Sequence, residues 1–130
     1  MQHNHCNEAD YNQSSIIICG IAGNPEDLAL YYSNQFSCSS NCYILSNFGI
    51  NVKLEYVYFY LLENINIIKQ FFTGNILPIL NKNLLSNYNI IVPSITIQEN
   101  IIFKKNIIYN KMEENENIIA KINRENRDLL

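Results

Sequence analysis

The sequence predicts an α+β fold, in which a small mixed β-sheet with packed helices precedes a long, coiled-coil-like C-terminal helix. Short isoleucine-rich runs that end in glycine or proline predict the strands, and apolar residues at helical spacing predict the helices. From residue 97 onward the chain lacks glycine and proline and is rich in Glu, Lys, Asn and Ile. With 130 residues, 48% of them hydrophobic, one small globular domain is expected at residues 16–96. We expect the polar residues 1–15 to be disordered and residues 97–130 to form a dimerisation or spacer helix.

Two strands are predicted in the first half of the chain. The β-branched run at residues 16–19 is closed by Gly20 and is typical of a buried strand. Gly23, Asn24 and Pro25 then predict a turn, because Gly and Asn tolerate left-handed backbone angles and Pro fixes its own. Residues 26–34 fit either an exposed hairpin or a helical turn. A second strand is expected at residues 42–45.

The helices of the domain follow. The first predicted helix covers residues 53–63, with Asn51 as its expected N-terminal cap and with one apolar face. That face comprises Leu54, Val57, Tyr58, Leu61 and Leu62. Residues 65–72 should continue helically until Thr73 and Gly74, where a left-handed glycine would end the helix. Residues 81–85 predict a short helical turn, and residues 90–92 predict a strand that ends at Pro93.

The C-terminal helix carries one apolar stripe with the three-four spacing of a coiled-coil seam. Its members are Ile101, Ile108, Met112, Asn115, Ile119, Ile122, Asn126 and Leu129. Asn115 and Asn126 interrupt the stripe, and buried asparagines favour one register over tighter packing. Because an exposed single helix would not need such a stripe, it predicts a partner helix.

Several segments carry motifs in a particular order. Residues 16–20 read IIICG, residues 36–45 read FSCSSNCYIL, and residues 52–62 read VKLEYVYFYLL. Residues 71–85 read FFTGNILPILNKNLL, and residues 90–98 read IIVPSITIQ. In this order they resemble the target-recognition domain of type I restriction-modification specificity subunits. Each motif alone is weakly specific. The resemblance covers residues 16–130, without the strands that precede this region in a complete domain of the family, so residues 16–96 resemble its C-terminal part.

This resemblance implies a non-catalytic subunit that recognises DNA within a complex containing methyltransferase and restriction subunits. It places Tyr31, Tyr32 and Asn34 in a loop that faces DNA. Lys82, in the Leu-Asn-Lys segment, is a further candidate, since a lysine near a helix start can reach a phosphate. It also implies that the long helix pairs, either in a homodimer or with another specificity-type helix, and spaces two recognition domains. The alternative is a degenerate fragment that acts only as a helix-mediated interaction module.

The charge balance limits how this chain could bind DNA. The net charge is −3, the pI is about 5.3, and the nine basic residues are scattered. Because phosphate contacts normally need clustered Lys and Arg, most of the electrostatic affinity would have to come from a partner. The sequence contains neither an apolar run long enough to cross a bilayer nor a signal peptide, so we expect a cytoplasmic location and no membrane partner.

Three other features have simpler interpretations. Cys38, Cys42, His3, His5 and Cys6 could supply zinc ligands, but the spacing between the two cysteines is unusual for zinc, and we expect neither metal nor cofactor. Cys19 and Cys42 are better read as buried, reduced strand residues. Tyr56, Tyr58 and Tyr60 could stack on bases, yet with a spacing of two they cannot all share one helix face, which favours a mixture of core and surface positions. The sequence shows no pattern of a catalytic nucleophile and its base.

Overall fold

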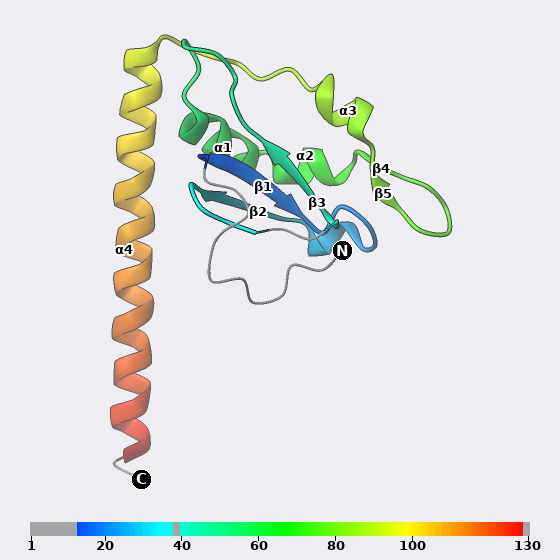
Figure 1. Ribbon diagram of the computed structural model, residues 1–130. Coiled ribbons are helices and arrows are strands. Elements are labelled where there is room, and N and C mark those ends of the chain that lie inside the picture. The colour runs from blue at the N-terminus through cyan, green and yellow to red at the C-terminus, as the bar shows by residue number, and fades with distance from the viewer. Residues whose placement is uncertain (1–12, 38–39, 129–130) are drawn as a thin grey trace.

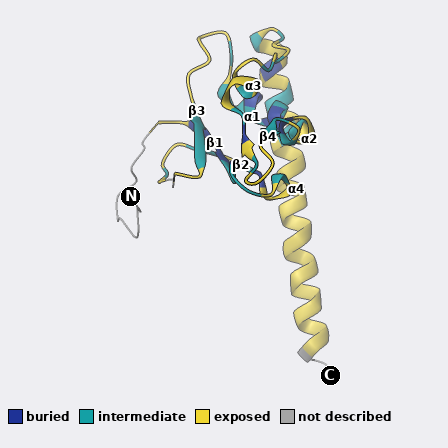
Figure 2. Cartoon of the chain, turned by 90° about the vertical axis from the view of Figure 1, so that its right-hand side faces the viewer, coloured by how far each residue is buried: buried dark blue, intermediate teal, exposed yellow. Residues whose placement is uncertain are grey.

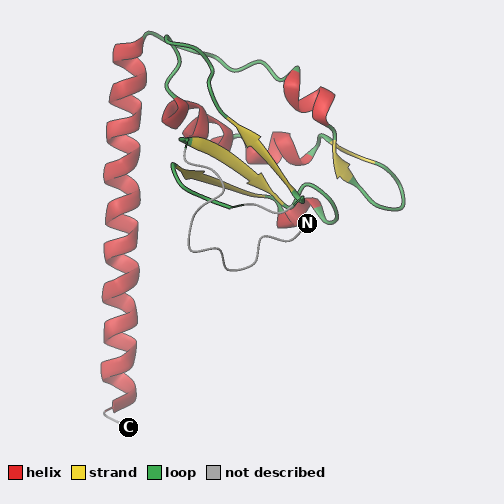
Figure 3. Ribbon diagram, in the orientation of Figure 1, coloured by secondary structure: helices red, strands yellow, loops and turns green. Residues whose placement is uncertain are grey.

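The computed structural model describes residues 13–37 and 40–128. It confirms the α+β class: a small sheet is covered on one face by helices, and one long helix stands beside this globular part and extends far beyond it (Figure 1; Figure 3). Strand pairing in both sheets of the described residues is antiparallel throughout, whereas a mixed sheet was expected.

The central sheet has the order β2-β1-β3. Strand β1 (Ser15–Cys19) lies between β2 (Ala29–Ser33) and β3 (Cys42–Leu45), with Ile17 opposite Tyr31 on one side and opposite Ile44 on the other. Because side chains alternate along a strand, Ile16 and Ile18 share the face opposite to that of Ile17. Both are fully buried in the main apolar cluster.

The predicted strands at residues 16–19 and 42–45 are therefore confirmed, with Ser15 added to the first. Ser15 is buried, so the strand begins inside the segment that was expected to be disordered. Residues 1–12 lie outside the described part of the chain.

Residues 26–34 adopt neither alternative in full. Asn24 caps a short 3-10 helix, η1 (Pro25–Asp27), by accepting a hydrogen bond from the Glu26 N–H, and the chain then enters β2. Strand β2 is an edge strand paired along its whole length with β1. The apolar residues Leu28 and Leu30 anchor it because both are buried in the core.

Two helices pack on the Ile16 and Ile18 face of the sheet. They are α1 (Leu54–Glu63) and α2 (Ile65–Lys69), separated at Asn64, and they contribute Val57, Leu61 and Ile68 to the core. The predicted first helix is confirmed, but its apolar surface is wider than one face, because Tyr56 and Phe59 are also buried. Phe59 is covered by the long helix, which the local pattern could not reveal.

The segment after α2 contains a hairpin that was not predicted. Strands β4 (Phe72–Thr73) and β5 (Ile79–Leu80) pair with Phe72 opposite Leu80. Gly74 therefore opens a hairpin loop and does not end a helix, because α2 already stops at Lys69. Its φ is +114°, and a side chain there would place its Cβ only 2.9 Å from the Leu77 carbonyl oxygen, which explains the glycine.

The short helix α3 (Lys82–Ser86) confirms the predicted helical turn. The Asn81 side chain caps it by accepting hydrogen bonds from the N–H groups of Asn83 and Leu84. The predicted strand at residues 90–92 is wrong: this stretch is an irregular connection without a strand partner. The Ile91 carbonyl accepts a hydrogen bond from the Tyr56 hydroxyl instead.

The long helix α4 (Ile95–Asp128) starts two residues earlier than predicted. Its N-terminal part packs against α1, and its C-terminal part projects away from the globular part (Figure 1). No helix among the described residues is both long and apolar enough to cross a membrane.

Candidate functional site

The joint between the globular part and α4 is organised by Gln98. Its side chain is fully buried and makes three hydrogen bonds. The Oε1 atom accepts from the Lys53 N–H at 2.8 Å, and Nε2 donates to the carbonyl oxygens of Asn51 and Pro93, both at 2.9 Å. Gln98 therefore satisfies the first free amide of α1 and ties it to the segment that leads into α4.

This arrangement replaces the predicted cap. Asn51 was expected to cap α1 with its side chain, but the N-cap residue is Lys53, which makes no side-chain capping bond. The cap comes from Gln98, 45 residues later in the chain. Because all polar atoms of the buried amide are used, Gln98 fixes where α4 begins relative to α1.

Three further contacts hold the first half of α4 against α1. The rings of Phe59 and Tyr109 stack with centroids 5.7 Å apart and planes 10° from parallel. Lys105 forms an ion pair with Glu63. Near the start of the helix, Lys53 and Glu99 are 3.5 Å apart. The contacts made by α1 thus end at about the fourth turn of α4.

Beyond this point α4 is exposed on all sides. Every residue from 106 to 127 is exposed, which Figure 2 shows as a continuous yellow helix below the globular part. Of the predicted stripe, Ile101 packs against the core of its own chain and is not available to a partner. Ile108, Met112, Asn115, Ile119, Ile122 and Asn126 are exposed, and Leu129 lies outside the described residues.

The structure corrects the placement of two residues proposed to contact DNA. Tyr31 and Tyr32 lie within β2, and only Asn34 lies in the bend that follows. Because side chains alternate along the strand, the two tyrosines point to opposite faces. Tyr32 packs against the core, 5.8 Å from the ring of Tyr58, whereas Tyr31 is 56% exposed on the outer sheet face. Tyr31 and Asn34 are the more accessible of the three, whereas Tyr32 is partly buried against the core.

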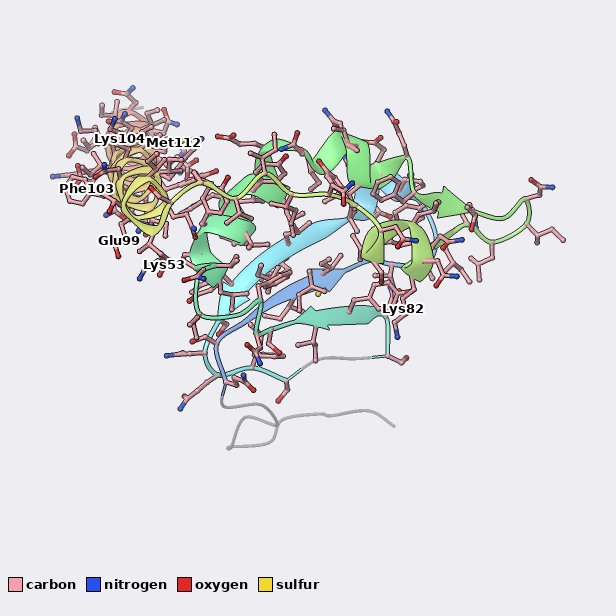
Figure 4. All side chains as sticks on the ribbon, turned by 90° about the horizontal axis from the view of Figure 1, so that it is seen from above. Lys53, Lys82, Glu99, Phe103, Lys104 and Met112 are labelled. Carbon is pink, nitrogen blue, oxygen red and sulfur yellow. The ribbon has the colours of Figure 1, made fainter. Side chains whose placement is uncertain are left out.

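Lys82 lies on a different element from these residues. It is exposed at the first position of α3 and forms no ion pair with any described residue. Figure 4 shows it pointing to the side of the sheet away from α1 and α2. The other two lysines of the globular part pair with Glu99 and Glu26. Lys82 is therefore the lysine of residues 40–94 that is best placed to meet a phosphate.

The outer sheet face, on which Tyr31 lies, also carries the two described cysteines. Cys19 and Cys42 are register partners on β1 and β3, and their Sγ atoms are 2.9 Å apart. With Ile17, Tyr31 and Phe36 they line a shallow pocket of about 340 Å³. Both cysteines are partly buried strand residues, close to the expected placement.

The zinc alternative involves residues that are mostly not described. Among residues 13–37 and 40–128, no group of three metal-binding side chains comes together. Cys38, His3, His5 and Cys6 lie outside these ranges, so the expectation that the protein binds no metal stays a prediction.

The tyrosines of α1 divide between core and half-buried positions. Tyr56 is buried and its hydroxyl donates to the Ile91 carbonyl at 2.5 Å, while Tyr58 and Tyr60 are half-buried. Burial, and to a smaller extent the neighbouring Tyr60, raises the pKa of the Tyr56 hydroxyl above its ordinary value of 10.0. Burial is also the main cause that raises the pKa of Tyr58. These rings pack the helix layer, which supports the structural interpretation over base stacking.

Sequence reasoning missed the residues that build the joint. Gln98 entered the sequence analysis only as the last residue of the segment at residues 90–98, and Phe59 and Tyr109 had no shared local signal. Only their burial and pairing in the folded chain identify them. No family model matches this chain, and comparisons with curated proteins and with solved structures found no significant match.

Proposed function

We propose that this chain is a DNA-recognition component that works inside a larger assembly, in the manner of a type I specificity subunit. The arrangement of the molecule supports this proposal most directly. A small α+β unit is fixed by Gln98 at one end of a 34-residue helix whose far part is exposed. At about 1.5 Å per residue, α4 spans about 50 Å, which suits a spacer between recognition units.

The assembly would contain methyltransferase and restriction subunits and would act in the cytoplasm. The acidic net charge of −3 makes partner subunits necessary, because phosphate contacts supply most of the non-specific affinity for DNA. Within the assembly, Lys82 would contact a phosphate, and Tyr31 and Asn34 would approach base edges. The chain itself would have no catalytic role.

Competition titrations with several duplexes test this proposal. We expect the isolated chain to bind DNA weakly and with strong salt dependence, and to become sequence-specific when a type I methyltransferase subunit is present. Within that complex, Lys82→Ala should weaken all duplexes by a similar factor, whereas Tyr31→Ala or Asn34→Ala should change their order of preference. Lys69→Ala is the matched control, because Lys69 is already paired with Glu26. Tight, sequence-specific binding by the chain alone would refute the dependence on a partner.

A second candidate function is an interaction module that has no contact with DNA. Two observations favour it: Tyr31 and Lys82 lie on different elements, and Tyr32 is partly buried against the core. Under this function α4 still associates. Ile108→Asp combined with Ile122→Asp should abolish association in sedimentation, while Asn110→Asp combined with Asn117→Asp adds the same charge off the stripe and should preserve it. If the double variant Ile108→Asp, Ile122→Asp still associates, the stripe is not the association surface. If the chain binds no DNA even with cognate partners present, the proposal of DNA recognition is wrong.

A further inference from the structure

Two cysteines face each other across the central sheet. Cys19 is the last residue of β1 and Cys42 is the first residue of β3, and the register of the two strands places them directly opposite each other. Their Sγ atoms are 2.9 Å apart, so the two sulfurs are in direct contact. Because side chains alternate along a strand, both lie on the outer sheet face with Ile17, away from α1 and α2. In the structure both are thiols, and each is partly buried.

The backbone hydrogen bonds indicate that a disulfide can bridge this pair. In an antiparallel ladder, opposite residues alternate between hydrogen-bonded pairs and closer, non-hydrogen-bonded pairs. The Gly20 N–H donates to the Asn41 carbonyl at 3.1 Å, one position beyond the cysteines on each strand. Gly20 and Asn41 therefore form a hydrogen-bonded pair, and Cys19 and Cys42 form one of the closer pairs, whose Cα atoms are typically about 4.5 Å apart. This separation lies within the range of about 4.4–6.8 Å that disulfides span.

We propose that Cys19 and Cys42 form an oxidative modification site, at which hydrogen peroxide converts the two thiols into a disulfide that joins β1 to β3. The strands already hold the two sulfurs in contact, so this reaction requires no rearrangement of the sheet. In reducing compartments disulfides are usually transient and serve redox sensing, which is the use that such a pair fits. The inference rests neither on DNA recognition nor on association through α4.

The position of the pair gives small reagents access to it. Both cysteines line the shallow pocket of about 340 Å³ on the outer sheet face, together with Tyr31 and Phe36. A water molecule accounts for about 30 Å³ of the liquid, so a pocket of this volume admits hydrogen peroxide and small thiol reductants. Cysteines that are fully buried in an apolar core are inert, whereas redox-active cysteines are partly exposed. Cys19 and Cys42 match the second description.

The reaction proceeds in two steps. In the first step, one thiolate attacks an oxygen of hydrogen peroxide, the O–O bond breaks, and the departing hydroxide takes up a proton to become water. The attacking sulfur becomes a sulfenic acid. In the second step, the other sulfur attacks this sulfenic sulfur, the S–S bond forms, and the oxygen leaves as a second water molecule. Overall, the two cysteines lose two electrons and two protons, and the peroxide gains them.

The disulfide would fasten one edge of the sheet. Among the described strands, β3 lies at an edge and pairs with β1 alone, beside which it runs in Figure 1. All four of its residues are only partly buried, so opening of this edge exposes little apolar surface. A covalent link from Cys42 to the central strand opposes that opening. Hydrogen exchange at the β3 amides should therefore be slower in the oxidised chain than in the reduced chain.

Mass spectrometry of the full-length chain tests the proposal. The substitutions Cys6→Ser and Cys38→Ser leave Cys19 and Cys42 as the only thiols, and circular dichroism checks that this variant is folded. Hydrogen peroxide should lower its intact mass by two hydrogen atoms and leave no thiol for alkylation. Residues 26 and 27 are acidic, so a protease that cuts after acidic residues separates the two cysteines. Their peptides should stay joined until a thiol reductant is added.

Two controls separate the effect of the sheet from chance encounters of thiols. In concentrated urea the same variant should cross-link at least about tenfold more slowly, because the strands no longer hold the sulfurs together. The second control adds Cys42→Ser and Ile44→Cys, which keeps a thiol on the outer face but moves it diagonal to Cys19, with Cα atoms about 7–8 Å apart. It should cross-link much more slowly than the original pair, since disulfides span less than about 7 Å between Cα atoms.

Four results would each overturn the proposal. They are oxidation of the thiols without a cross-link, equal cross-linking rates in the folded chain and in urea, equal rates for the original pair and the Ile44→Cys control, and unchanged exchange at the β3 amides after oxidation. These experiments contain neither DNA nor any other subunit. Their failure would therefore leave the proposed DNA recognition untouched, just as a failure of DNA recognition would leave the cysteine pair untouched.

Discussion

Replacing Gln98 with methionine tests how the long helix is attached. The substitution keeps the length and approximate volume of the side chain but removes its hydrogen bonds to Lys53, Asn51 and Pro93. At about 1 kcal/mol net for each bond, the loss would be about 3 kcal/mol. Asn51 and Lys53 are exposed residues, so water can replace part of what their backbone groups lose. We therefore expect the free energy of unfolding to fall by about 2 kcal/mol, a large share of the total for a small domain.

Urea unfolding followed by circular dichroism measures this change, and amide hydrogen exchange locates it. Exchange at the Lys53 amide should accelerate more than exchange in the middle of β1, because the Lys53 N–H loses its acceptor. Gln70→Met is the matched control, since Gln70 is exposed. If the two variants lose the same stability and the Lys53 amide keeps its protection, Gln98 does not hold α4 to α1.

Two further substitutions examine the globular part. Gly20 has a φ of +78°, and a Cβ there would lie 2.7 Å from the Asp27 carbonyl oxygen, so Gly20→Ala should cost more stability in urea unfolding than Gly23→Ala, where the Cβ meets nothing within 4 Å; equal costs would refute the steric explanation. Because the pKa values of Tyr56 and Tyr58 are raised in the folded chain, the unfolded chain loses these two protons first as pH rises. The contribution of the two hydroxyls to the free energy of unfolding should therefore be fully present below about pH 10 and be lost above it. Tyr56→Phe should lower stability at pH 7 by about 1 kcal/mol and make the alkaline decline shallower, and an unchanged slope in a pH series of unfolding curves would contradict the assignment to Tyr56.

Local patterns predicted the elements whose signals are contained within a few neighbouring residues. The isoleucine run before Gly20, the strand at residues 42–45, the short helix after Asn81 and the long helix without glycine or proline are all present. Each depends on burial periodicity, a cap or the absence of a helix breaker, and these properties can be read from adjacent side chains.

The errors share a physical cause. Thr73 and Gly74 carry the signature of a helix end, but pairing of Phe72 with Leu80 turns the segment into a hairpin. By local pattern, Tyr31 and Tyr32 could belong to a loop or a strand. They form part of a strand because their segment pairs with β1. A glycine with a left-handed backbone serves a helix end and a hairpin equally well, so the choice depends on which distant segment offers a partner.

By itself, therefore, the sequence determined the α+β class, the order of most elements, and a C-terminal helix with an apolar stripe that exceeds the needs of an isolated helix. Only the tertiary structure decided where that helix is attached to the globular part. It also decided that Ile101 of the stripe packs against the core of its own chain, whereas the stripe from Ile108 onward is exposed. It also decided that Gln98 caps α1 in place of Asn51. Hydrophobic periodicity acts over a few residues, whereas hydrogen bonds of buried polar groups join segments about 45 positions apart and form only when the chain has folded.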